Sequence, residues 1–80
     1  MKTIQIKFRG IDNWNRPVFK DVNSKNHFGS VNTLFNSYAT EDEIINFFRA
    51  NLGELEYFGN SFGCEPHGGL ADNITFEIIN

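Results

Sequence analysis

The fold class of this chain is decided by residues 40–53, which have the sequence TEDEIINFFRANLG. Thr40 is a natural N-cap, and Glu43 three residues later completes a capping box. Acidic residues fill the first turn, where the helix dipole favours negative charge. Apolar side chains then recur every three or four residues, and Gly53 can adopt the left-handed conformation that ends helices. We therefore predict one helix over Thr40–Gly53 that packs its apolar face on a sheet.

The segments on either side of this helix have the composition of short β-strands. In Thr3–Arg9, apolar and polar residues alternate, as in a half-buried strand, and Asn73–Ile79 mirrors this pattern closely enough to be its neighbour. Pro17 must lie at the start of its strand or on an edge, because proline donates no hydrogen bond. Asn32–Tyr38 fits either a single helical turn or an irregular segment on the core. The predicted strands are Thr3–Arg9, Arg16–Asp21, His27–Val31, Glu54–Asn60 and Asn73–Ile79.

These elements predict a single α+β domain over residues 1–80. We expect a small antiparallel sheet of about five short strands, with one helix packed on one face, in the order β-β-β-α-β-β. The chain has nine Phe, two Tyr and one Trp, which suit a small core filled with large side chains. Glycine follows Phe at Phe28, Phe58 and Phe62, which indicates close packing; the alternative is a flat platform for stacking.

Several classes of protein are disfavoured by the composition. Cys64 is the only cysteine, so the chain cannot form an intramolecular disulfide and is not a secreted disulfide scaffold. The first residues alternate apolar and charged side chains, unlike a signal peptide, and no apolar run approaches the roughly 20 residues of a membrane span. We therefore expect a cytoplasmic protein without a membrane partner.

Charge is unevenly distributed along the chain, although the net charge is only −3. Residues 1–25 carry six Lys and Arg against two Asp, whereas residues 26–80 carry one Arg against eight Asp and Glu. The two halves either neutralise each other across neighbouring strands or leave one basic and one acidic face. The basic face would bind nucleic acid through Lys7, Arg9, Arg16, Lys20 and Lys25, although such binders usually carry a net positive charge.

The connection between the first two strands is the first candidate binding site. It contains Trp14, Asn15 and Arg16, and Trp and Arg are the residues most enriched at interface hot spots. In the structural alternative, Trp14 caps one end of the core while Arg16 stacks on it or pairs with Asp12.

A second candidate loop gathers Cys64, Glu65 and His67 within four residues. A turn at Pro66 could bring His67 to the thiol and activate it as a nucleophile. The alternative is a small buried thiol followed by a loop. A structural zinc site requires four ligands, and Cys64 with His67 and the distant His27 falls short. We predict no metal and no cofactor.

The chain also resembles a group of small proteins of bacterial plasmids, phages and conjugative elements, in Firmicutes and gut bacteria. The resemblance is carried by residues 10–20 together with Tyr57-Phe58-Gly59, Phe62 and Cys64-Glu65-Pro66. No catalytic motif is defined for that group. The resemblance implies an accessory role on a mobile element and assigns no functional residue.

Three hypotheses about function follow from the sequence. The first is a non-enzymatic module that binds a protein partner, or a second copy of itself, through the Trp14–Arg16 connection and an exposed face or edge of the sheet. The second is a nucleic-acid-binding protein that uses the basic N-terminal strands. The third is a small thiol enzyme that uses Cys64 and His67.

Overall fold

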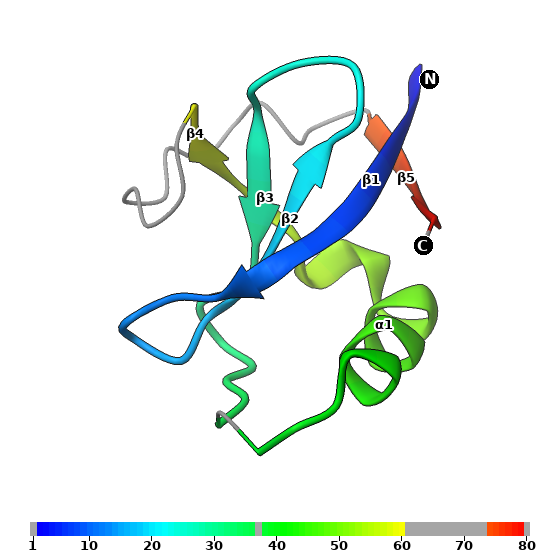
Figure 1. The fold of residues 1–80 in the computed structure, drawn as a ribbon. Coiled ribbons are helices and arrows are strands. Elements are labelled where there is room, and N and C mark those ends of the chain that lie inside the picture. Colours follow the sequence, from blue (N-terminus) through cyan, green and yellow to red (C-terminus); the bar gives the residue numbers. More distant parts are fainter. Residues whose placement is uncertain (1, 37, 61–73, 80) are drawn as a thin grey trace.

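A computed structural model describes residues 2–36, 38–60 and 74–79. Strands β1 (Lys2–Ile11), β2 (Pro17–Asp21) and β3 (His27–Gly29) precede helix α1 (Glu41–Ala50). A 3-10 turn, η1 (Leu52–Glu54), then leads to β4 (Glu56–Gly59), and β5 (Ile74–Ile79) ends the described chain. The predicted α+β class and the order β-β-β-α-β-β are therefore confirmed (Figure 1).

The five strands form one sheet in the order β4-β3-β2-β1-β5, and β5 lies beside β1 as its pattern predicted. The sheet is mixed, which corrects the expectation of an antiparallel one. β1 and β5 are parallel, whereas the other three pairs are antiparallel. Strand direction alternates along the chain, so the fifth strand runs the same way as the first. Placing these two strands side by side makes a parallel pair unavoidable.

Helix α1 begins as its sequence predicts and ends earlier. The N-cap Thr40 accepts a hydrogen bond from the Glu43 backbone N–H at 3.2 Å. The helix ends at Ala50 with Asn51 as its C-cap, and Gly53 lies inside η1. The prediction that Gly53 ends the helix is therefore wrong. The Asn51 side chain donates to the Phe47 carbonyl at 2.8 Å and satisfies one of the free carbonyls at this end.

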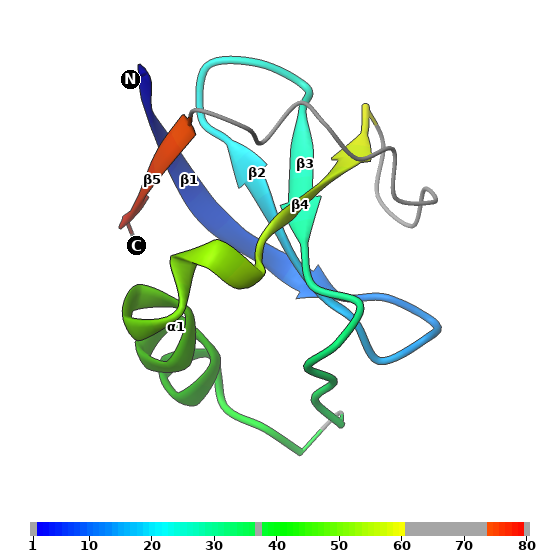
Figure 2. The same ribbon diagram turned by 180° about the vertical axis from the view of Figure 1, so that it is seen from behind.

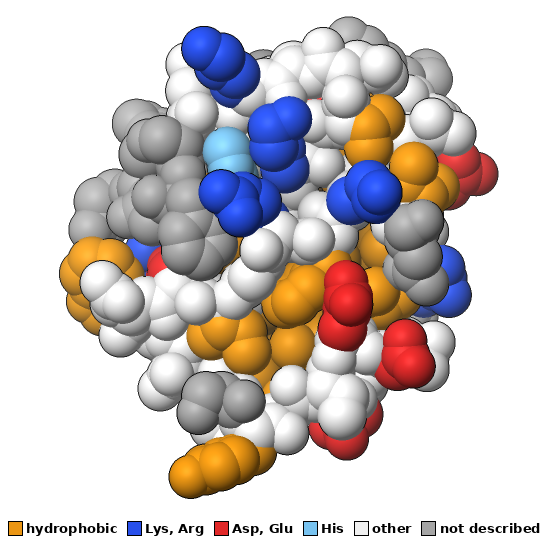
Figure 3. Space-filling model, viewed as in Figure 1, with side chains coloured by type: hydrophobic (Ala, Val, Ile, Leu, Met, Phe, Trp, Pro, Cys, Tyr) orange, Lys and Arg blue, Asp and Glu red, His pale blue; other side chains and the backbone are white. Residues whose placement is uncertain are grey.

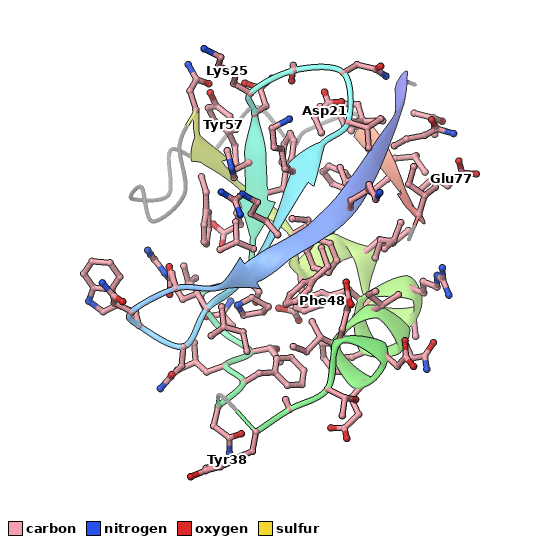
Figure 4. The ribbon with its side chains drawn as sticks, in the orientation of Figure 1. Asp21, Lys25, Tyr38, Phe48, Tyr57 and Glu77 are labelled. Atoms are coloured by element: carbon pink, nitrogen blue, oxygen red, sulfur yellow. The ribbon has the colours of Figure 1, made fainter. Side chains whose placement is uncertain are left out.

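The core lies between α1 and the inner face of the sheet. Phe48 points from α1 toward the sheet in Figure 4, and its ring meets the ring of Phe19 edge-on at 5.5 Å. Phe28 makes a similar contact with Phe76 at 4.9 Å. Arg49 also links α1 to β5, because its Nη2 donates to the Ile78 carbonyl at 3.2 Å. Figure 2 shows α1 near the C-terminal end of β5.

Residues 31–36 and 38 are irregular rather than a helical turn. Phe35 packs on the core, whereas Leu34 and Tyr38 are 55% and 91% exposed. This segment thus follows the second of the two alternatives that its sequence allowed.

A close approach of backbone and ring requires glycine at position 29. A Cβ added to Gly29 would lie 2.5 Å from the Pro17 carbonyl oxygen and 2.7 Å from Cε2 of Phe58. The Phe28-Gly29 pair therefore serves close packing, as its sequence indicated. The Phe62-Gly63 pair lies outside the described residues.

We predict that Gly29→Ala destabilises the protein by about 1–3 kcal/mol, because the backbone of β2 and the buried Phe58 ring must both move. The matched control is Gly53→Ala, whose added Cβ meets nothing within 4 Å. Urea unfolding of both variants measures the difference. Equal stability of the two variants would contradict the packing at Gly29.

Candidate functional site

The turn between β1 and β2 is fixed by the carboxylate of Asp12. One carboxylate oxygen, Oδ1, accepts hydrogen bonds from the backbone N–H groups of Trp14 and Arg16, each at 2.9 Å. The Asp12 backbone adds two further bonds: its carbonyl accepts from Asn15 N at 3.0 Å and its N–H donates to the Arg16 carbonyl at 3.1 Å. Asn15 has a φ of 62°, a left-handed conformation that asparagine tolerates better than most residues. The turn therefore has one defined shape.

The second oxygen of Asp12 forms a buried ion pair. Oδ2 lies 2.7 Å from Nε of Arg16, and the two side chains are only 1% and 8% exposed, respectively. The guanidinium carbon of Arg16 lies 4.8 Å from the ring centroid of Phe58 and 4.9 Å from that of Trp14. Arg16 thus contacts two aromatic rings while its charge is balanced by Asp12.

Trp14 remains exposed in this arrangement. Its side chain is 57% exposed although its ring stacks on Arg16. Arg16 pairs with Asp12 and stacks on Phe58, so the indole packs against a buried side chain. An exposed aromatic ring on a fixed support can contact a partner with little loss of conformational entropy on binding.

The predicted site residues are thus divided between exposed and buried positions. Trp14 and Asn15 are exposed, and Arg16 is 7% exposed. Arg16 stacks on Trp14 and pairs with Asp12, as the structural alternative expected, but Trp14 faces solvent and does not cap the core. Arg16 therefore positions Trp14, and it is removed from the predicted phosphate contacts because its charge is buried. Binding by this segment stays a prediction.

The other predicted loop cannot be placed. Cys64, Glu65 and His67 lie outside the described residues, so the predicted thiol chemistry stays a prediction. Within the described ranges, no three His, Cys, Asp or Glu side chains gather as metal ligands. In the same ranges, no helix combines the length and apolar character needed to cross a membrane.

Sequence reasoning missed the segment that lies beside the Trp14 turn. The Phe35 backbone N–H donates to the Asn15 carbonyl at 2.9 Å, so residues 31–36 run next to the turn. Leu34 is 55% exposed and Val31 is 36% exposed on this segment. A signal was present, since residues 26–40 contain no Asp, Glu, Lys or Arg. We call the exposed residues of both segments the uncharged end: Asn13, Trp14, Asn15, Val31, Asn32, Leu34 and Asn36.

A polar depression of about 550 Å³ at the other end of β1 is a weaker candidate. Its carboxylates already have partners within the fold. Asp21 accepts from Asn23 N at 2.8 Å and from the Ser24 hydroxyl at 2.9 Å, and Glu77 accepts from the Gln5 amide at 2.7 Å. These bonds shape the β2–β3 turn and join β1 to β5, so we place the candidate site at the uncharged end.

Comparison of the chain with protein-family models, with curated proteins and with solved structures finds no match. We therefore infer function from the geometry of the Trp14 turn and its neighbours.

We predict that Asp12→Asn destabilises the protein by about 3–5 kcal/mol, because it leaves the buried Arg16 charge without its partner. Asparagine can still accept the two backbone hydrogen bonds, so the substitution isolates the ion pair. The matched control is Asp21→Asn, a carboxylate of similar burial whose hydrogen bonds come from the uncharged groups of Asn23 and Ser24. Chemical unfolding should show a much smaller loss for the control, and similar losses would contradict the role of the ion pair.

Proposed function

We propose that this protein is a non-enzymatic interaction module that binds a protein partner, or a second copy of itself, through the uncharged end. The observation that carries the proposal is the state of Trp14, which is 57% exposed and stacked on a buried arginine. Tryptophan is among the residues that contribute most binding energy at protein interfaces.

The chemistry around Trp14 favours a protein over a charged ligand. The neighbouring exposed residues are apolar or carry amides, and Arg16 is neutralised within the fold. The centres of protein interfaces are depleted in charged residues and enriched in aromatic ones. An apolar ring surrounded by amide groups can bury its surface and still satisfy polar groups of the partner.

The rigidity of the turn supports the same proposal. Asp12 fixes the backbone through its carboxylate, and the guanidinium of Arg16 stacks on the indole ring. A preorganised contact loses less conformational entropy on binding than a mobile one, so more of the contact energy appears as affinity.

The proposal also includes where the protein acts, which is as an accessory protein of a mobile element in the cytoplasm. The resemblance of the chain to proteins of plasmids, phages and conjugative elements supports an accessory role on a mobile element. We place that role in the cytoplasm, in keeping with the single cysteine. A small module without its own chemistry would act by recruiting or occupying a partner.

We predict that Trp14→Ala weakens binding by roughly thirtyfold or more, as expected when a hot-spot residue is truncated. The test combines quantitative affinity capture from cell extract with sedimentation equilibrium of the purified chain, so that a partner and self-association are both detected. The matched control is Tyr38→Ala, which removes a more exposed aromatic residue outside the uncharged end (Figure 4).

Proteins or self-association lost with Trp14→Ala and retained with Tyr38→Ala would support the proposal. Circular dichroism should show both variants folded, because both side chains are exposed. The proposal fails if the unaltered chain neither captures a protein nor self-associates, or if both substitutions have the same effect.

A further inference from the structure

The outer face of the sheet, opposite the core, carries a group of cationic side chains. Lys7 on β1 lies directly opposite Lys20 on β2, and Lys20 lies opposite His27 on β3. Arg9 lies two residues along β1, and Lys25 is in the β2–β3 turn. Figure 3 shows Lys and Arg side chains gathered over β1–β3, whereas acidic side chains lie over α1 and at the β5 side. We call this the basic face: Lys7, Arg9, Lys20 and Lys25.

The register of the basic face works against stability. Like charges directly opposite each other on neighbouring strands are destabilising, and opposite charges at such positions are stabilising. Lys7 and Lys20 nevertheless occupy one cross-strand pair. Arrangements that break a local folding rule are most often found where a protein performs its function.

His27 lies opposite Lys20 on the same face of the sheet, and its imidazole adds no charge at neutral pH. Its ring is buried, and burial lowers its pKa below the ordinary value, with Arg9 and Lys20 acting in the same direction. Hydrogen bonds to backbone at Lys25 and Gly59 act the other way, and Nδ1 lies 2.8 Å from the Lys25 carbonyl oxygen. The imidazole therefore fixes the backbone from which the Lys25 side chain extends.

Three carboxylates near this face accept hydrogen bonds or pair with groups other than the four cations of the basic face. Asp12 pairs with Arg16, and Asp21 accepts the turn hydrogen bonds of Asn23 and Ser24. Glu77, on the same side of the sheet, accepts from Gln5 two residues before Lys7. On the face seen in Figure 3, acidic side chains over α1 lie below the Lys and Arg cluster rather than within it. The positive charge of the basic face is therefore separated in space from much of the negative charge that dominates the sequence.

We propose that the basic face binds the phosphate backbone of duplex DNA, weakly and without reading its sequence. Strands in a sheet are about 4.8 Å apart, so cations on neighbouring strands form a compact cluster that can meet adjacent phosphates. Three of the four cations are lysines, which act as point charges toward phosphate. The net charge of −3 limits the affinity and confines contact to this face.

A duplex fits these observations better than a membrane surface. A peripheral membrane surface combines cations with exposed apolar side chains that enter the lipid. The neighbours of Lys7 along β1 are Gln5 and Arg9. Its register partners are Lys20 on β2 and Ile79 on β5, and Ile79 is only partly exposed. The inference is independent of the proposed function, since the uncharged end shares no residue with the basic face.

The test is fluorescence anisotropy of a labelled duplex of about 20 base pairs titrated between about 50 and 200 mM salt. Four phosphate contacts predict that the unaltered chain loses roughly 150-fold in affinity across that range. Lys7→Gln removes one contact, so it should bind more weakly at low salt and lose only roughly 40-fold. The matched control is Asn46→Glu on the exposed side of α1, which changes net charge by the same single unit.

The expected result is a reduced salt dependence for Lys7→Gln and an unchanged one for Asn46→Glu. Three outcomes would overturn the proposal: no binding to the duplex at low salt, equal losses for the two variants, or binding only to phosphatidylserine vesicles or to polyglutamate. The last outcome would assign the face to a lipid surface or to an acidic protein. Trp14→Ala should leave DNA binding unchanged, which separates this test from that of the proposed function.

Discussion

The ion pair between Asp12 and Arg16 is the interaction on which the end of the first hairpin depends. Burying two charges costs desolvation energy that their mutual attraction only partly offsets, so a buried pair contributes more to a defined geometry than to net stability. Here the pair is supplemented by two backbone hydrogen bonds to Asp12 and by aromatic rings on both sides of Arg16. These contacts fix the turn, and the turn fixes the exposed indole of Trp14.

The same contacts connect distant parts of the chain. Phe58, on edge strand β4, stacks on Arg16 and fills the space that Gly29 leaves open on β3. The Trp14 turn is thereby joined to β4, at one end of the sheet, through side chains rather than through backbone pairing. A change at Asp12 is therefore expected to affect the position of β4 as well as the shape of the turn.

How much the sequence could predict depended on whether the signals were local. The helix start was predictable because Thr40, Glu43 and the acidic first turn act within a few residues. The sequence placed the last strand beside the first, but the parallel direction of the β1–β5 pair was missed, because the sheet was expected to be antiparallel. The helix end was missed because the Asn51 side chain caps Phe47, which makes Gly53 unnecessary for that purpose. Stacking of Phe58 on Arg16 was beyond prediction, because it joins residues far apart in the sequence.

The uneven charge distribution along the chain gives the folded protein separate basic and acidic surfaces. The basic N-terminal residues gather on the outer face of the sheet, and α1 carries acidic residues in its first turn. The uncharged end is neither basic nor acidic, because Asp12 and Arg16 are buried in an ion pair with each other. A small chain that presents distinct surfaces of this kind could hold a protein and a polyanion at once.

Trp14 is exposed to solvent and is nevertheless held in one position by its stacking contact with Arg16. Because Trp14 is the only tryptophan, its time-resolved fluorescence anisotropy measures this directly. We predict an indole that is readily quenched by acrylamide and whose anisotropy decays almost entirely with the tumbling of the whole protein. A large, fast component of local ring motion in the folded chain would contradict it.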